Sequence, residues 1–180
     1  MHMIAIMSDP FQSLFSDTVA KTLATGEALF RTGDRVSRVY LVRHGVIALR
    51  RTTLQGVELQ LQAARPGDIP AEASIYSDQY HCDAVALSPS EVLEARREDF
   101  KRALATTPSL GEAWSARLAH AVQNARIRAE LRTLRTVRER VDAWLSSGGT
   151  LPRKGRWQEL AAELGVSREA LYREFAKRRR

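Results

Sequence analysis

Three charged residues near the C-terminal end of the sequence, Arg168, Glu169 and Arg173, have side chains that can form hydrogen bonds with DNA bases. A guanidinium group can donate two hydrogen bonds to guanine, and a carboxylate can accept one from the amino group of cytosine. We therefore expect this segment to read a site that contains G·C pairs. An alternative interpretation is a solvated first turn of a helix, in which Glu169 stabilises the helix dipole.

The residues around these three predict a helix-turn-helix. Residues 157–164 have the spacing of a short amphipathic helix, and residues 168–178 form a second one. Between them, Gly165 permits a tight turn and Ser167 can cap the second helix. Small and apolar residues at the crossing complete the pattern: Ala161, Val166 and Leu171. The alternative interpretation is an ordinary corner between two helices of an all-α protein.

The positive charge of the chain is concentrated in its C-terminal third. Residues 117–180 carry 16 Lys and Arg against 7 Asp and Glu, a net charge of +9, whereas residues 1–116 carry −2. A basic segment on a nearly neutral chain favours a polyanionic partner, either nucleic acid or an anionic membrane face. The excess is mostly arginine, which favours nucleic acid because its planar fork matches phosphate and guanine. A solvated helical surface is the alternative.

The first half of the sequence predicts short strands separated by glycine turns. Gly26, Gly33, Gly45, Gly56 and Gly67 recur at intervals of 7 to 12 residues. Short apolar or alternating runs lie between and beyond them, at 28–30, 39–42, 46–49, 57–61, 82–87 and 91–95. Evenly spaced short strands of this kind are typical of a barrel, a jelly roll or a sandwich.

The period of the apolar residues changes after Pro108. From Leu110 to Ala129 they recur every three or four positions, which predicts one face of a long helix that begins near Pro108. A second apolar series starts at Leu134 and ends at Gly148, a good helix stop. The first helix must bury its apolar face, and its length favours packing against a second copy of the chain.

Taken together, these motifs resemble the Crp/Fnr family of bacterial transcription regulators. The runs 26–34, 40–49 and 66–74 are similar to the family's cyclic-nucleotide-binding-like β roll. The resemblance implies an α+β fold, with a sensor roll over residues 1–108, a dimerisation helix over 109–133 and a helix-turn-helix DNA-binding domain over 134–180. It implies a homodimer on palindromic double-stranded DNA, contact with RNA polymerase, and a half-site similar to TGTGA. The six DNA-binding residues that we expect are Ser167, Arg168, Glu169, Tyr172, Arg173 and Lys177.

The resemblance has two departures near the C-terminal end. The family usually has a β-hairpin wing after the recognition helix, and this sequence stops at Arg180. We therefore expect DNA affinity to rest more on the basic residues 177–180, against the sugar–phosphate backbone. Glu174 occupies a position that is often apolar in the family, and we expect Phe175 to fill the core instead.

The effector site departs more strongly from the family pattern. Cyclic-AMP-binding members hold the ribose with a Gly-Glu pair and the phosphate with an Arg-Ser pair. This sequence has Ala71-Glu72 and then His81-Cys82-Asp83, so the phosphate-binding arginine is missing and Asp83 would repel the phosphate. We expect no response to cyclic AMP in the usual mode, and an unidentified effector or none. Its candidate pocket residues are Glu72, Ser74, His81 and Cys82.

Two alternatives involve the pair His81 and Cys82. Either residue can ligate haem, but adjacent residues of a strand point to opposite faces and could not share one iron. Oxidation of Cys82 would make a redox switch, although only His81 lies nearby in sequence to lower the pKa of its thiol. A further alternative is an effector-binding or interaction module with weak or no DNA binding. We expect no resident cofactor or metal.

Other function classes fit the sequence poorly. A single cysteine excludes an internal disulfide and a four-cysteine metal site. The four histidines are scattered, and the chain has no Ser-His-Asp set and no phosphate-binding loop of the G-x-x-x-x-G-K type, so we expect no enzyme activity. No apolar run approaches the roughly 20 residues that span a bilayer, and the first seven residues are too short for a secretory signal. We expect a soluble cytoplasmic protein with no membrane partner.

Overall fold

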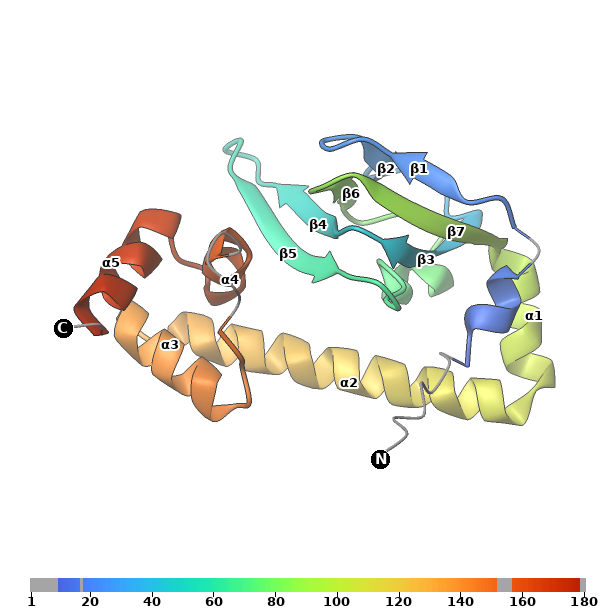
Figure 1. Ribbon diagram of the computed structural model, residues 1–180. Coiled ribbons are helices and arrows are strands. Elements are labelled where there is room, and N and C mark those ends of the chain that lie inside the picture. The colour runs from blue at the N-terminus through green and yellow to red at the C-terminus, as the bar shows by residue number, and fades with distance from the viewer. Residues whose placement is uncertain (1–9, 17, 152–156, 179–180) are drawn as a thin grey trace, which may run out of the picture. The chain divides into compact units, whose positions relative to one another are not determined.

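The computed structural model describes residues 10–16, 18–151 and 157–178 of the chain. These residues form two compact units, and the boundary between Leu118 and Ala119 falls inside the long helix α2 (Figure 1). All the described strands belong to the first unit, and the second consists of helices. No described helix is both long and apolar enough to cross a membrane.

The strands of the first unit form two antiparallel sheets. One sheet has the order β1–β7–β3, with β1 at Lys21–Leu23, β7 at Ser90–Arg96 and β3 at Arg38–His44. The other has the order β2–β6–β4–β5, with β2 at Ala28–Phe30, β6 at Asp83–Ala86, β4 at Ile47–Thr52 and β5 at Glu58–Ala64. The predicted β roll is therefore confirmed. Strand β1 was not predicted, because only Leu23 of its three residues is apolar.

Buried side chains occupy both faces of the β1–β7–β3 sheet. Val42 of β3 packs in a cluster with Ile47 and Ala84 of the other sheet, so this cluster lies between the two sheets. The neighbouring residue Leu41 points to the opposite face, as alternation along a strand requires. There it packs in a second cluster, which contains Phe15, Ile75, Ala95, Phe100 and Trp114.

Helical segments cover that second face. They are the 3₁₀ helix η1 at Gln12–Phe15, helix α1 at Arg97–Thr106 and the start of helix α2 at Pro108–Thr133. Helix α2 begins at the predicted Pro108. Helix α1 was not predicted; Phe100 is its only buried residue, and most of its other residues are polar or charged. Another 3₁₀ helix, η2 at Glu72–Tyr76, lies between β5 and β6 in the chain.

One glycine turn is sterically constrained by its surroundings. Gly45 joins β3 to β4 with a φ of +82°, a conformation that favours glycine. A Cβ atom there would lie 2.6 Å from the carbonyl oxygen of Pro89 and 2.7 Å from the Cα of Ser90. Gly56, in the β4–β5 turn, has a similar φ of +79° but open space around it. Backbone packing at the start of β7 therefore adds a second requirement for glycine at position 45.

The second unit packs three helices and the end of α2 around one core. Helix α3 covers Val137–Ser146, α4 covers Trp157–Leu164 and α5 covers Arg168–Arg178. The fully or largely buried members of the core are Leu131, Val141, Trp144, Trp157, Leu160, Ala161, Leu164, Leu171 and Phe175. Phe175 thus fills the core as the sequence predicted. Helix α3 ends at Ser146, where Gly148 (φ +90°) supplies the predicted stop.

Residues 112–147 contain no proline or glycine, yet they do not form one continuous helix. Helix α2 ends at Thr133, and Thr136 starts α3 with a capping box. The Thr136 hydroxyl oxygen accepts a hydrogen bond from the Glu139 N–H at 3.1 Å, and the Glu139 carboxylate accepts one from the Thr136 N–H at 2.9 Å. The hydrogen bond from the Thr136 N–H is the main cause of the lowered pKa of Glu139, and one from the Thr136 hydroxyl adds to it. The cap therefore separates α3 from α2.

Candidate nucleic-acid interface

The corner between α4 and α5 has the geometry that the sequence predicted. Gly165 adopts a φ of +64°, and the N–H of the next residue, Val166, donates to the carbonyl of Ala161 at 2.9 Å. Ala161 and Leu171 are buried where the two helices meet. The turn therefore places α5 across α4, with the Leu171 side of α5 in the core and the opposite side exposed.

Ser167 caps the start of α5. Its hydroxyl oxygen accepts a hydrogen bond from the Ala170 N–H at 3.2 Å. Glu169 also interacts with this helix start: hydrogen bonds from its own backbone N–H and from the Ser167 hydroxyl lower the pKa of its carboxyl group. The carboxylate is fully exposed and ionised near neutral pH. It has two oxygens with several acceptor positions, so capping leaves it able to accept further hydrogen bonds.

The exposed side of α5 carries the predicted base-reading residues. Arg168, Glu169 and Arg173 are all exposed. The guanidinium carbon of Arg168 lies 5.3 Å from the centre of the Tyr172 ring, which packs in turn against Trp157 at 4.7 Å between ring centres. This cation–π contact restrains Arg168, so less conformational entropy is lost when it binds a ligand.

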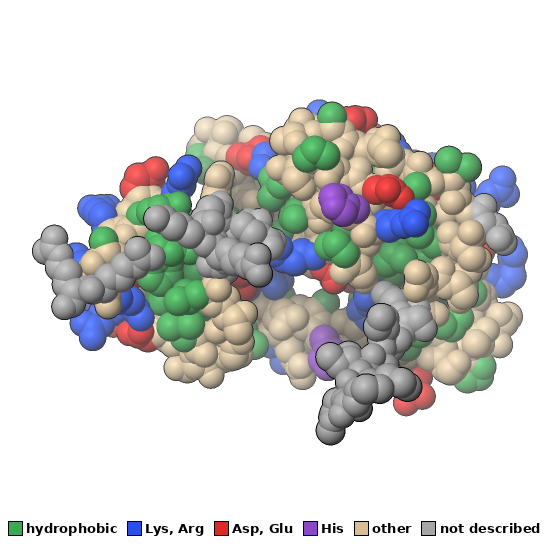
Figure 2. Space-filling view, viewed as in Figure 1, with side chains coloured by type: hydrophobic (Ala, Val, Ile, Leu, Met, Phe, Trp, Pro, Cys, Tyr) green, Lys and Arg blue, Asp and Glu red, His purple; other side chains and the backbone are tan. Residues whose placement is uncertain are grey.

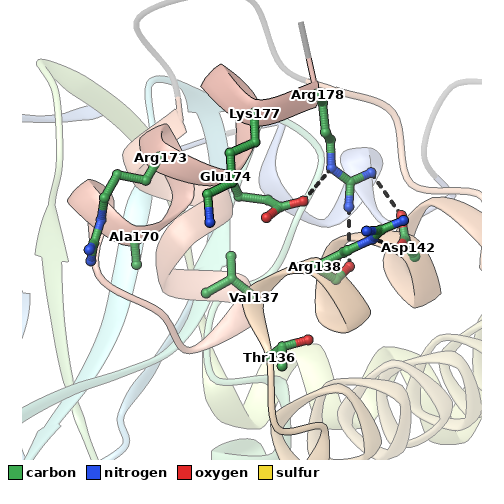
Figure 3. A pocket seen from close by; sticks show the side chains of 9 residues that line it. All are labelled: Thr136, Val137, Arg138, Asp142, Ala170, Arg173, Glu174, Lys177 and Arg178. Atoms are coloured by element: carbon green, nitrogen blue, oxygen red, sulfur yellow. Dashed lines mark hydrogen bonds and ion pairs between the residues drawn. The ribbon is translucent and has the colours of Figure 1, made fainter. Parts of the chain in front are cut away.

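An open groove of about 620 Å³ lies between α5 and the start of α3 (Figure 3). Four basic and two acidic side chains line it, together with smaller residues: Arg138, Arg173, Lys177, Arg178, Asp142, Glu174, Thr136, Val137 and Ala170. Lys177 is exposed, and the Arg138 side chain is 79% exposed. The surface of the second unit shows basic and acidic side chains together (Figure 2). The groove therefore offers the exposed cations of Arg138, Arg173 and Lys177 beside the exposed face of α5.

Arg178 forms a polar cluster that ties the end of α5 to α3. Its guanidinium lies 2.7 Å from a carboxylate oxygen of Asp142 and 2.8 Å from one of Glu174, and it donates to the carbonyl of Arg138 at 3.2 Å (Figure 3). The Glu174 side chain is only 11% exposed. This pairing explains why a charged residue is tolerated at position 174. Arg178 is engaged within the protein, which differs from the predicted role of residues 177–180 on the DNA backbone. Arg179 and Arg180 lie outside the described residues.

The four candidate effector residues differ in their exposure and in the segments that hold them. Glu72 and Ser74 lie on η2, and Ser74 is buried. His81 is exposed, with its Nε2 atom 3.1 Å from the Ser77 hydroxyl, whereas Cys82 is buried in the core between the sheets. His81 and Cys82 both precede β6, so the argument from a strand does not apply to them, but one side chain is exposed and the other is buried.

The environment of Cys82 is apolar. Burial raises the pKa of its thiol; the nearby charge of Arg51 lowers it, and those of Asp83 and Glu72 raise it. The neutral thiol is thus the stable form near neutral pH. The adjacent core contains stacked aromatic rings: Phe30 lies 3.6 Å from Tyr80 between ring centres. Cys82 therefore lies in the same buried cluster as these rings, where it contributes to the hydrophobic core.

The backbone at Ala71 adopts a conformation that favours glycine. Its φ is +55°, and among the described residues it alone has a positive φ without being glycine. It precedes η2, at the position where cyclic-AMP-binding members have the glycine of the Gly-Glu pair. The local path of the chain is therefore compatible with the family's Gly-Glu geometry, although the residue differs.

Asp83 is bound by groups of the protein itself. One carboxylate oxygen accepts a hydrogen bond from the Thr32 N–H at 2.7 Å, and the other lies 3.4 Å from the Arg31 guanidinium. The Thr32 hydrogen bond is the main cause of the lowered pKa of Asp83. Asp83 begins β6, and Arg31 and Thr32 follow β2, so the carboxylate connects two neighbouring strands.

Within the described ranges, no three His, Cys, Asp or Glu side chains are grouped so that they could hold a metal ion. The donor set around His81 and Cys82 likewise does not fit haem, because one side chain is exposed and the other lies in the core.

Comparison with known proteins identifies similar sequences and structures. Residues 20–107 match the cyclic nucleotide-binding domain family. The chain is 32% identical over 156 residues to the cyclic AMP receptor protein of Thermus thermophilus, an alignment that covers 82% of this chain and 71% of that protein.

Two solved structures share the fold at lower sequence identity. The c-di-GMP-responsive global regulator CLP of Xanthomonas campestris has a TM-score of 0.70 at 20% identity, over 94% of this chain and 90% of that one. FixK2 of Bradyrhizobium japonicum has a TM-score of 0.74 at 17% identity, over 89% and 83% of the two chains. The sequence identity with the Thermus protein and the matched domain establish the relationship: this chain belongs to the Crp/Fnr family of bacterial transcription regulators.

Proposed function

We propose that the chain is a homodimeric transcription regulator that binds palindromic double-stranded DNA through α5. The observation that carries this proposal is the exposed row of Arg168, Glu169 and Arg173 on a helix whose opposite side is buried by Leu171 and Phe175. A helix that is anchored in this way can enter a major groove with these side chains toward the bases. The family relatives are transcription regulators, which agrees with this role.

The chemistry of the exposed row favours G·C pairs. Arg168 and Arg173 each offer a fork of donors for the O6 and N7 atoms of guanine, and Glu169 offers an acceptor for the N4 amino group of cytosine. Ser167, Tyr172 and Lys177 flank this row and are proposed to contact the sugar–phosphate backbone. Arg138, which lines the same groove, is a further candidate for a phosphate contact.

We propose that α2 supplies the dimer contact. Two of its large apolar side chains remain exposed in the single chain, Val122 at 51% and Ile127 at 38%. Burial of such side chains against a second copy is favourable by roughly 25 cal/mol for each Å² of apolar surface. A two-fold dimer would present two copies of α5 to successive half-sites, about 34 Å apart.

We further propose that the regulator does not respond to cyclic AMP in the usual mode. Asp83 brings a negative charge to the region where the family binds the cyclic phosphate, and the protein's own Thr32 and Arg31 bind that carboxylate. A saturable increase in DNA affinity on addition of cyclic AMP would contradict this proposal. Contact with RNA polymerase and a cytoplasmic location stay predictions that depend on the DNA-binding role.

The test is a selection of duplex sites followed by fluorescence anisotropy with the preferred palindrome. Arg173→Ala should reduce discrimination between the preferred site and a site with the cognate G·C pair exchanged by about tenfold or more, because one bidentate contact supplies about 1–3 kcal/mol. Arg126→Ala, an exposed arginine on α2, is the matched control and should keep that discrimination. Wild-type affinity should also fall steeply with added salt.

Two results would contradict the proposal. If wild-type protein binds duplex DNA with no sequence preference, or with no salt dependence, the DNA-reading role of α5 is wrong. If Arg173→Ala and Arg126→Ala retain the same discrimination, the base contact assigned to Arg173 is wrong. The alternative of an interaction module predicts a third outcome, weak or no binding of the wild-type protein to duplex DNA.

A further inference from the structure

Arg140 of α3 donates four hydrogen bonds to backbone carbonyls from three parts of the second unit. Its Nε atom donates to the Leu134 carbonyl at 2.9 Å, and one terminal nitrogen donates to that of Arg132 at 3.0 Å. The other terminal nitrogen donates to the carbonyls of Leu164 at 3.0 Å and Gly165 at 2.9 Å. One guanidinium group thus joins the end of α2 to the turn between α4 and α5.

Two of the four bound carbonyls belong to helix ends, and the other two follow those ends directly in the chain. Arg132 lies in the last turn of α2, and Leu164 is the last residue of α4. The last carbonyls of a helix lack intrahelical partners and carry partial negative charge. A cation between two such helix ends is stabilised by both dipoles. The guanidinium has five N–H groups, and this arrangement uses the fixed angles between them.

The position of Arg140 is itself fixed by the start of α3. Its backbone N–H donates to the Thr136 carbonyl at 3.2 Å, within the first turn that the capping box of Thr136 and Glu139 defines. A lysine at this place would carry the same charge, but its ammonium group could not reach carbonyls in three directions with a planar fork. The arrangement therefore depends on the shape of the side chain as well as its charge.

We infer that Arg140 is a positioning residue that sets the orientation of the α4–α5 pair relative to the end of α2. Any displacement of the α2 end is then transmitted to the recognition helix through these four hydrogen bonds. This inference rests on the proposed function, because α5 is the element that is proposed to read DNA. Arg140 itself contacts no base in this account and acts through the placement of Arg168 and Arg173.

The test measures that orientation directly in the full-length chain, without DNA. Spin labels are attached to cysteines that replace the exposed residues Ala129 on α2 and Ala176 on α5, in a Cys82→Ala background. Labelled chains are diluted with unlabelled chains so that only distances within one chain are recorded. Wild-type and Arg135→Gln proteins should each give one narrow distance distribution. Arg135 is exposed, and Arg135→Gln removes one positive charge, as Arg140→Gln does, so it controls for the change of charge.

Arg140→Gln should broaden or split the distribution, and Arg140→Lys should do the same because charge alone does not restore the fork. If Arg140→Gln prevents folding, as judged by circular dichroism, Arg140→Lys decides the question. A narrow, unshifted distribution in Arg140→Lys would overturn the inference and reduce Arg140 to an ordinary helix cap.

A second arm of the experiment measures DNA discrimination with the selected palindrome. Arg140→Lys should lose about tenfold in specific affinity while its non-specific binding matches that of wild type, since the cationic charge is retained. Unchanged discrimination would overturn the link to DNA reading. If wild-type protein binds no DNA, the proposed function fails, and the distance distributions still decide whether Arg140 positions the helices.

Discussion

Removal of the Arg178 guanidinium should destabilise the second unit by about 2 kcal/mol. The loss leaves the Glu174 carboxylate, 11% exposed, without the partner that lies 2.8 Å away. A charge-assisted hydrogen bond to a covered carboxylate is worth about 1.5–3 kcal/mol. The Asp142 carboxylate is 53% exposed, so its pair with Arg178 adds less than about 1 kcal/mol despite the 2.7 Å distance.

The measurement is urea unfolding followed by the fluorescence of Trp144 and Trp157, which both lie in the second unit. The third tryptophan, Trp114, is replaced by phenylalanine in every variant. Its buried Nε1 atom has no hydrogen-bond partner among the described residues, so the replacement removes no polar contact.

A double variant separates the loss of the Glu174–Arg178 ion pair from the loss of packing by the Arg178 side chain. Arg178→Met should cost about 2 kcal/mol, whereas Glu174→Leu combined with Arg178→Met should recover most of that loss, because no covered charge is left unpaired. The control is Arg138→Ala, whose pair with Asp142 is long (3.8 Å) and exposed, and it should change stability by less than about 0.5 kcal/mol. Equal, small effects of Arg178→Met and Arg138→Ala would refute the reasoning.

Three further predictions concern the first unit. Gly45→Ala should destabilise it by about 1–3 kcal/mol more than Gly56→Ala, because both positions share the left-handed φ but only position 45 is crowded by backbone; calorimetry of the two variants checks the difference. Cys82 should react with iodoacetamide far more slowly in folded than in urea-unfolded protein, and equal rates would contradict its burial. Because burial raises the pKa of its thiol in the folded state, the stability of the folded protein should fall from its value at neutral pH as the pH rises from the unfolded through the folded pKa. The Asp83 carboxyl has a lowered folded pKa, so its stabilising contribution is present above the unfolded value and lost as pH falls through the folded one; Asp83→Asn should therefore flatten the acid limb of a stability–pH curve, and an unchanged limb would contradict the assignment.

Much of the fold follows from local sequence patterns. The alternation in residues 58–61 predicted β5, and the glycine turns marked the breaks between strands. At the C-terminal end, Gly165 and Ser167 predicted the turn and the cap that the structure has. These features depend on neighbouring residues, so they can be read from a short stretch of chain.

Interactions between distant residues were not predictable in the same way. Glu174 has its partner Arg178 four residues later on the same helix, but the contact of Arg178 with Asp142 joins two helices and could not be read from a local pattern. Arg140 could not be distinguished from the other arginines, since its role depends on carbonyls 24 and 25 residues away. One missed feature did have a sequence pattern: the Thr136-x-x-Glu139 spacing is that of a capping box and could have located the start of α3.

The carboxylate of Asp83 supplies a permanent negative charge to the first unit. A phosphate supplied by a metabolite leaves its site when the metabolite is scarce, but a charge built into the polypeptide cannot be diluted away. The hydrogen bond from Thr32 to Asp83 therefore needs no bound ligand, and it weakens when the carboxylate is protonated at low pH.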